Sequence, residues 1–179
     1  MAASDPTPPL PRRRSAFDAV MAGSSLPMAL LIPLWVALGR TWFGPAGWLS
    51  HALAFTAGPL LAVVMLLAAA RITANAAAYR PFGAPRRTSL LLLGQYAAAA
   101  GFGFLLPDFG DGAGVHGSVL SRLAGEEYVG ISAGLANPLG IAALGLTVAV
   151  LVTAFRDAAR TRSLQQAAAG HAPATASAR

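Results

Sequence analysis

Four long apolar stretches, separated by short polar or glycine-rich segments, dominate the pattern along the chain. We place them at about residues 19–39, 50–70, 89–106 and 137–155. A hydrocarbon core of about 30 Å takes roughly 20 helical residues to cross, at about 1.5 Å per residue. None of the stretches alternates between apolar and polar positions, so the pattern predicts helices and not strands of a barrel. The expected fold class is an all-α integral membrane protein, with four transmembrane helices in an antiparallel bundle.

The two ends of the chain have a different composition. Residues 1–16 are rich in proline and arginine, and residues 163–179 are rich in alanine, serine and threonine. Such segments cannot bury enough apolar surface to fold by themselves. We therefore predict two disordered tails, which flank a transmembrane domain over residues 17–162.

Prolines modify this pattern within the apolar stretches. Pro27 and Pro33 fall inside the first stretch and Pro59 inside the second, where a proline removes one hydrogen bond and bends a helix. Pro138 stands at the expected start of the fourth helix, directly after Asn137. Because asparagine caps helices and proline suits their first turn, we expect that helix to begin near residue 137.

The charges orient the predicted helices. With 55% hydrophobic and 11% charged residues, the chain is too apolar for a soluble surface. It has no lysine, and eleven of its thirteen arginines lie in residues 1–16, in residues 71–87 or after residue 155. Only Arg40 and Arg122 lie on the other side. The positive-inside rule then places both termini in the cytoplasm, and the arginine-rich, lysine-free composition suggests a bacterial plasma membrane.

The same distribution of charge limits the partners. Because the arginines flank apolar helices and do not gather in one patch, we expect the lipid bilayer as the partner and no nucleic acid. Small residues recur at four-residue spacing within the stretches, as helix packing in lipid requires. They favour packing within the chain, and they also suit self-association or contact with another membrane protein.

Few residues suggest chemistry. There is no cysteine, and no ionisable residue lies at mid-depth in the four stretches, so we expect no cofactor and no proton-coupled carrier. Gln95 is the most polar side chain inside the third stretch. A glutamine at that depth more often makes an interhelical hydrogen bond than binds a substrate, so we predict such a contact for Gln95.

The connection between the third and fourth stretches, over residues 107–136, holds the remaining candidates. Asp108, Asp111 and His116 could bind a divalent metal or act as acid and base, although their spacing matches no metal motif and a solvated loop is the simpler interpretation. Residues 115–123 have apolar positions at helical spacing, which predicts a short amphipathic helix on the outer side. On that helix Val119, Arg122 and Leu123 are the candidate partner-binding residues.

The pattern as a whole favours a small multi-pass membrane protein that acts as an accessory or structural subunit packed against another membrane protein. Two alternatives stay open. One is an oligomeric transporter or channel component, suggested by the bent first helix. The other is a membrane enzyme or metal-binding protein that uses the acidic outer loop. The lack of catalytic groups makes an enzyme the less favoured class.

Overall fold

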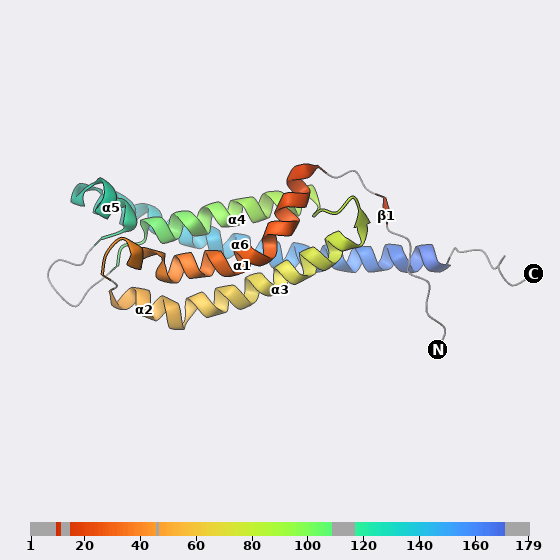
Figure 1. Cartoon of the computed structure of the whole chain (residues 1–179), viewed down its shortest axis with the longest axis horizontal. Coiled ribbons are helices and arrows are strands. Elements are labelled where there is room, and N and C mark those ends of the chain that lie inside the picture. The colour runs from red at the N-terminus through yellow and green to blue at the C-terminus, as the bar shows by residue number, and fades with distance from the viewer. Residues whose placement is uncertain (1–9, 12–14, 46, 109–116, 171–179) are drawn as a thin grey trace, which may run out of the picture.

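The structure is a computed structural model that describes residues 10–11, 15–45, 47–108 and 117–170. Within them the chain is mostly helical, and four long helices lie side by side (Figure 1). The helices are α1 (Ala16–Leu38), α2 (Trp48–Phe55), α3 (Ala57–Ala77), α4 (Arg86–Leu105), α5 (Val119–Ala124) and α6 (Val129–Gly170). Two short 3-10 helices, η1 (Gly39–Trp42) and η2 (Glu126–Tyr128), precede α2 and α6.

The predicted number of long apolar helices is confirmed. Among the described residues, four helical segments are long and apolar enough to cross a membrane, namely Ala16–Trp42, Trp48–Ala77, Arg86–Leu105 and Glu126–Ala168. In each of them at most 39% of the most apolar window is buried inside the chain. Most of the apolar surface of these helices therefore faces outward.

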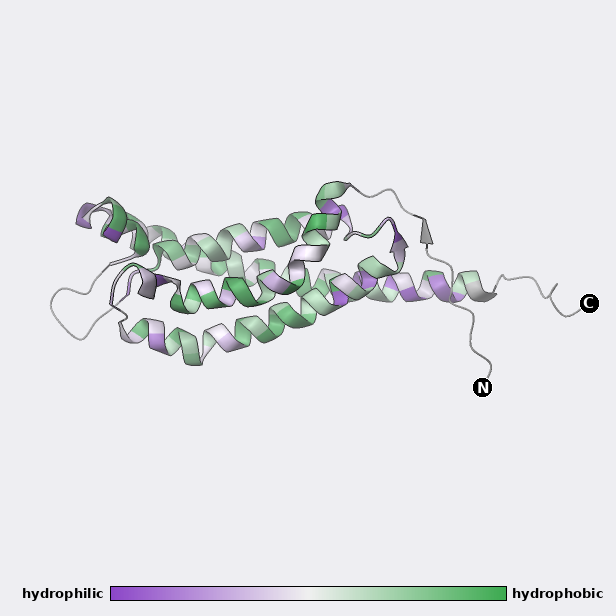
Figure 2. Cartoon of the chain, in the orientation of Figure 1, coloured by the Kyte–Doolittle hydropathy of each residue, from purple (hydrophilic) through white to green (hydrophobic). Residues whose placement is uncertain are grey.

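Contacts between distant residues define two ends of the bundle. At the Arg40 end, Arg40 of η1 donates a hydrogen bond to the carbonyl of Leu106, just after α4. At the opposite, Arg80 end, the amide of Ala84 donates to the carbonyl of Asp18 in α1, at 3.1 Å. Hydrophobic residues predominate between the ends, and hydrophilic residues are more frequent near them (Figure 2).

The first turn of α1 is fixed by its own side chains. Ser15 and Asp18 form a capping box, in which each side chain bonds the backbone amide of the other residue. This pairing satisfies amides that have no partner within the helix. The strand β1 (Leu10–Pro11) precedes it and pairs in parallel with β2 (Tyr79–Arg80). Pro27 and Pro33 lie inside α1, which bends visibly along its length (Figure 1).

The second predicted stretch is divided into two helices. The helix breaks at Thr56, so α2 ends at Phe55 and α3 begins at Ala57, with Pro59 in its first turn. A proline is tolerated there because the first amides of a helix have no intrahelical partner. The break also needs Gly58, since a Cβ atom on it would lie 2.8 Å from the carbonyl oxygen of Leu53.

The expected start of the fourth helix near Asn137 was wrong. α6 begins at Val129 and continues through Pro138 to Gly170, a total of 42 residues. One position of the turns before the proline is anchored, because the Ser132 hydroxyl accepts a hydrogen bond from Ser118 at 2.8 Å and both serines are fully buried. These contacts offset the single hydrogen bond that a proline removes from a helix.

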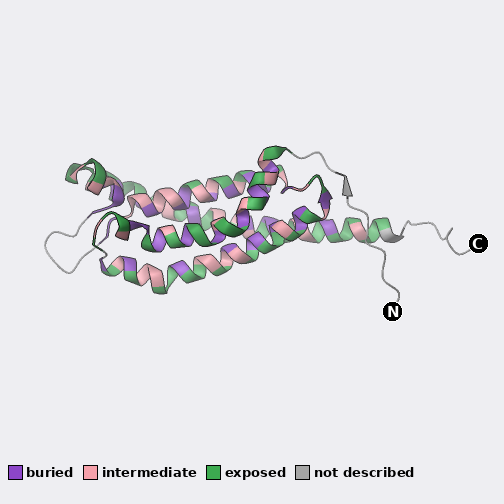
Figure 3. Ribbon diagram, viewed as in Figure 1, coloured by how far each residue is buried: buried purple, intermediate pink, exposed green. Residues whose placement is uncertain are grey.

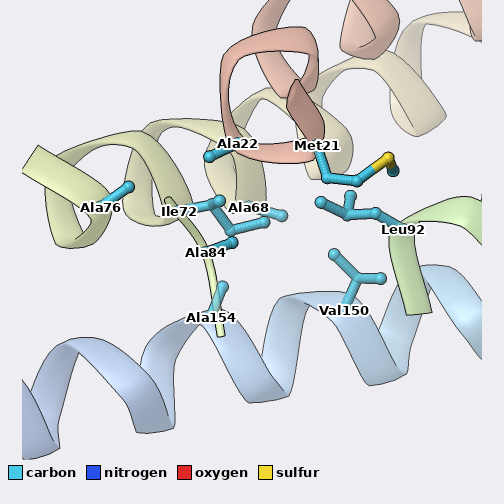
Figure 4. Packing of buried hydrophobic residues seen from close by; sticks show 9 residues of the cluster. All are labelled: Met21, Ala22, Ala68, Ile72, Ala76, Ala84, Leu92, Val150 and Ala154. Carbon is cyan, nitrogen blue, oxygen red and sulfur yellow. The ribbon is translucent and has the colours of Figure 1, made fainter. Parts of the chain in front are cut away.

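Two clusters of small apolar side chains form the interior. The cluster nearer the Arg80 end is drawn in Figure 4 and comprises Met21, Ala22, Ala68, Ile72, Ala76, Ala84, Leu92, Val150 and Ala154. The cluster nearer the Arg40 end comprises Ala29, Ile32, Val36, Met65, Ala69, Ala98, Ala99 and Ala143. Because alanine is the commonest residue in both, the helix backbones can approach closely.

Trp35 joins α1 to α4 beside the second cluster. Its indole nitrogen donates a hydrogen bond to the carbonyl of Ala100 at 3.0 Å. Gly103 makes room for this ring, because a Cβ atom on it would lie 2.8 Å from the indole nitrogen. The glycine is therefore a requirement of the packing.

Candidate functional site

Three polar side chains are buried together at the Arg40 end of the bundle. Arg40, Ser50 and Asp108 are each at most 2% exposed, and they come from η1, α2 and the residues just after α4. A buried charge is costly unless it is paired and hydrogen-bonded.

Asp108 is the acceptor at the centre of this cluster. Its Oδ2 accepts hydrogen bonds from the backbone amide of Gly47 at 2.9 Å and from the Ser50 hydroxyl at 2.5 Å. Its own amide donates to the carbonyl of Gly117 at 3.1 Å. Burial would raise the pKa of Asp108, but the bonds from Ser50 and Gly47 and the nearby charge of Arg40 outweigh it and hold the pKa below its ordinary value.

Arg40 carries the opposite charge and binds two backbone carbonyls just after the end of α4. Its Nη1 donates to the carbonyls of Leu106 and Pro107, at 3.3 and 3.4 Å. The last carbonyls of a helix have no partner within it, so a basic side chain placed there is favourable. Among the described residues, no acceptor bonds Nε or Nη2 of Arg40.

Arg122 ties α5 to the segment after η1. Its Nη2 donates to the carbonyl of Pro45 at 3.1 Å. Gly44 allows this contact, because a side chain at that position would collide with the guanidinium group of Arg122. Arg40 and Arg122, the two arginines set apart by the sequence, thus both bind backbone carbonyls at this end.

The two remaining candidate partner-binding residues, both on α5, differ in exposure. Val119 is 1% exposed, so in this fold it packs inside the chain and is not available to a partner. Leu123 is 63% exposed. The helix begins at Val119 after a capping box between Ser118 and Ser121, and Val115 of the predicted helix lies outside the described residues.

Of the three candidate metal-binding residues in the outer loop, only Asp108 is among the described residues. Asp111 and His116 lie outside the described residues. The carboxylate of Asp108 is used by the bonds within the chain that are given above. Among the described ranges, no group of three or more histidine, aspartate or glutamate side chains lies close enough to hold a metal ion.

Gln95 points into the interior of the bundle. It is 1% exposed, and its amide nitrogen donates to the sulfur of Met65 in α3 at 3.4 Å. This is a contact between two helices, at the boundary of the two apolar clusters.

A second polar cluster, at the Arg80 end, has no counterpart in the sequence analysis. The Thr161 hydroxyl of α6 donates to the Asn75 side chain of α3 and lies 2.9 Å from the Tyr79 hydroxyl. Nearby, the Thr88 hydroxyl of α4 donates to Asp157 at 2.8 Å. Asn75, a polar residue near the end of a largely apolar helix, was the available signal.

Comparison with known proteins adds no further information about this site. No protein-family model, curated protein or solved structure matches the chain.

Proposed function

We propose that the chain is a four-span integral membrane protein of a bacterial plasma membrane, with its helices antiparallel and both termini in the cytoplasm. The outward-facing apolar surface supports this placement, since many large apolar side chains on all four long helices are exposed (Figure 3). The charge supports the orientation. Arg40 and Arg122 share one end, and Arg86 shares the other with Arg156, next to the bonded pair Thr88 and Asp157.

Within that membrane, the protein acts as an accessory or structural subunit that packs against another membrane protein. The observation that carries this proposal is the uncovered face of α6. Gly130, Gly134 and Gly145 have no atom of the chain within 4 Å of the position a side chain would take. Ile141 and Val148, which are 73% and 58% exposed, continue the same helical face. Glycines on an open face allow a partner helix to approach closely.

The described cluster of ionisable groups favours a structural role over catalysis. Asp108 bonds the backbone of Gly47 and Gly117, and Arg40 bonds the carbonyl of Leu106 just after α4. These bonds hold the connecting segments in place. An enzyme needs a reactive group that a substrate can reach. Both side chains are almost fully buried, so neither is presented to a substrate.

If the protein were a transporter, its substrate would have to pass between copies of the chain and not through one copy. The cavity at the centre of the bundle is about 10 Å³ in volume, which is too small for a substrate path through a single copy. A groove of about 220 Å³ between α1 and the start of α3 is lined by apolar side chains. Neither feature favours transport over packing.

Cross-linking in membranes tests the accessory role. The chain has no cysteine, so a single Gly145→Cys substitution allows one photo-crosslinker to be attached to the open face of α6. We expect one defined adduct with another membrane protein, and we expect a second substitution, Gly134→Leu, to abolish that adduct by blocking close approach.

The control variant is Leu93→Cys, which places the same reagent on an exposed position of α4. It should give lipid adducts only. An adduct that is the same from both positions, or one that survives Gly134→Leu, would contradict the proposal.

A further inference from the structure

A small cavity lies where the four long helices meet, between the two apolar clusters. Its volume is about 10 Å³. Its lining includes Ser25 of α1, Met65 of α3, Gln95 and Tyr96 of α4, and Thr147 and Val150 of α6. All of these except Tyr96 are buried. The centre of the bundle thus contains a polar layer within an otherwise apolar interior.

The amide of Gln95 is incompletely bonded in this layer. Its nitrogen donates to the sulfur of Met65, and a thioether is a weak acceptor. Its oxygen, Oε1, is buried and accepts no hydrogen bond. Buried polar groups in native proteins are nearly always bonded to protein or to an ordered water molecule. Gln95 therefore needs a hydrogen-bond donor that comes from the cavity.

The hydroxyl groups of Ser25 and Thr147 cannot supply that donor. Ser25 donates its proton to the carbonyl of Ala22 at 2.7 Å, and Thr147 donates to that of Ala143, also at 2.7 Å. A hydroxyl has one proton and two acceptor lone pairs, so each oxygen can still accept. The phenol of Tyr96 lies beside the Ser24 hydroxyl, and Ser24 does not line the cavity. The layer thus contains several free acceptor sites and too few donors.

We propose that this cavity binds one water molecule, which donates a hydrogen bond to Oε1 of Gln95 and links α4 to the hydroxyl oxygens of the facing helices. Water fits because it has two protons to donate, one to Oε1 of Gln95 and the other to the oxygen of Ser25 or Thr147. A volume of about 10 Å³ corresponds to a single water molecule by the usual criterion of about 10–15 Å³. No carboxylate is among the lining residues, so a cation would have no compensating charge. The site depends on the packing of the four helices and does not rest on the proposed accessory role.

Radiolytic footprinting of the full chain in detergent micelles tests the proposal. Ionising radiation converts bound water to hydroxyl radicals, which oxidise the nearest reactive side chain. Met65 lines the cavity and Met21 does not, although both are 6% exposed, so Met21 is a matched internal control. We expect oxidation of Met65 to be at least several times faster than that of Met21. Equal rates for the two methionines would overturn the proposal.

The substitution Gln95→Leu tests whether the oxidation of Met65 depends on the amide of Gln95. Gln95→Leu removes the acceptor and leaves an apolar side chain, so we expect Met65 oxidation to fall to the rate of Met21 while the melting temperature is kept. Continued rapid oxidation of Met65 in this variant would also overturn the proposal. Thr147→Val, which preserves side-chain shape, serves if Gln95→Leu does not fold. It removes one of the hydroxyl oxygens facing the cavity and should slow Met65 oxidation, and an unchanged rate would count against the site.

Discussion

At the scale of single residues, Asp108 is buried where its carboxylate is hydrogen-bonded. Asp108 receives a hydroxyl, a backbone amide and a facing guanidinium group. This arrangement makes its negative charge part of the folded state. Loss of that charge would leave Arg40 buried with no compensating group among these contacts.

We expect Asp108→Asn to lower the free energy of unfolding by about 3 kcal/mol at neutral pH, because it leaves the buried charge of Arg40 uncompensated. Chemical unfolding in detergent micelles would measure the loss. Glu126→Gln is the control, since Glu126 is exposed and its charge should matter little.

We also expect the difference in stability between wild type and Asp108→Asn to depend on pH. The pKa of Asp108 is lowered in the folded state, so its contribution to stability is fully present above its ordinary pKa of about 3.9. The contribution is lost as the pH falls through the lowered pKa. The difference between wild type and Asp108→Asn should thus be constant from about pH 5 to 8 and should shrink below about pH 4. A difference that grew on acidification would contradict this assignment.

At the scale of elements, the sequence predicted which segments form the long apolar helices but not how they begin, end or break. Whether a segment forms a long apolar helix depends on its length and apolarity, and both can be read from that segment alone. The start of α6 depends on Ser132 meeting Ser118, and the break before α3 depends on Gly58 meeting Leu53 and Ala37. Local proline rules therefore misplaced the start of α6 because a tertiary contact outweighed them.

Two glycines of α4 should respond in opposite ways to alanine. A Cβ atom at Gly94 would lie 3.6 Å from Leu146, an ordinary contact, whereas one at Gly103 would lie 2.8 Å from the Trp35 indole nitrogen and 3.3 Å from the Val36 backbone. Alanine gains about 0.5–1 kcal/mol over glycine within a helix, and overpacking costs about 1–3 kcal/mol. We expect Gly94→Ala to raise the melting temperature slightly and Gly103→Ala to lower it. Similar shifts for both variants would refute the role given to Trp35.

At the scale of the whole molecule, polar clusters lie at both ends, and a single polar layer lies in the middle. The proximity of Arg40 to Asp108 could not be predicted, because the two residues are far apart in the sequence and come near each other only when the helices assemble. Asp108 and Arg122 were singled out for a metal site and for a partner, and the structure uses both to hold connections in place.

The proposed orientation predicts the side of each connection. Fluorescent reporters fused after residue 83 and at the C-terminus should be active in the cytoplasm, because most arginines lie at that end. A phosphatase that is active only outside should work when inserted near residue 45. Phosphatase activity after residue 83 would reverse the assigned orientation.

The length of α6 has a practical consequence. At about 1.5 Å per residue, its 42 residues reach roughly 63 Å, about twice the thickness of a hydrocarbon core. The part near Gly170 extends past the other helices (Figure 1). A rigid helical fusion that continues α6 in register would carry a large soluble domain outside the detergent micelle. That domain would give this 179-residue chain the size and asymmetric outline needed for particle alignment in electron cryomicroscopy.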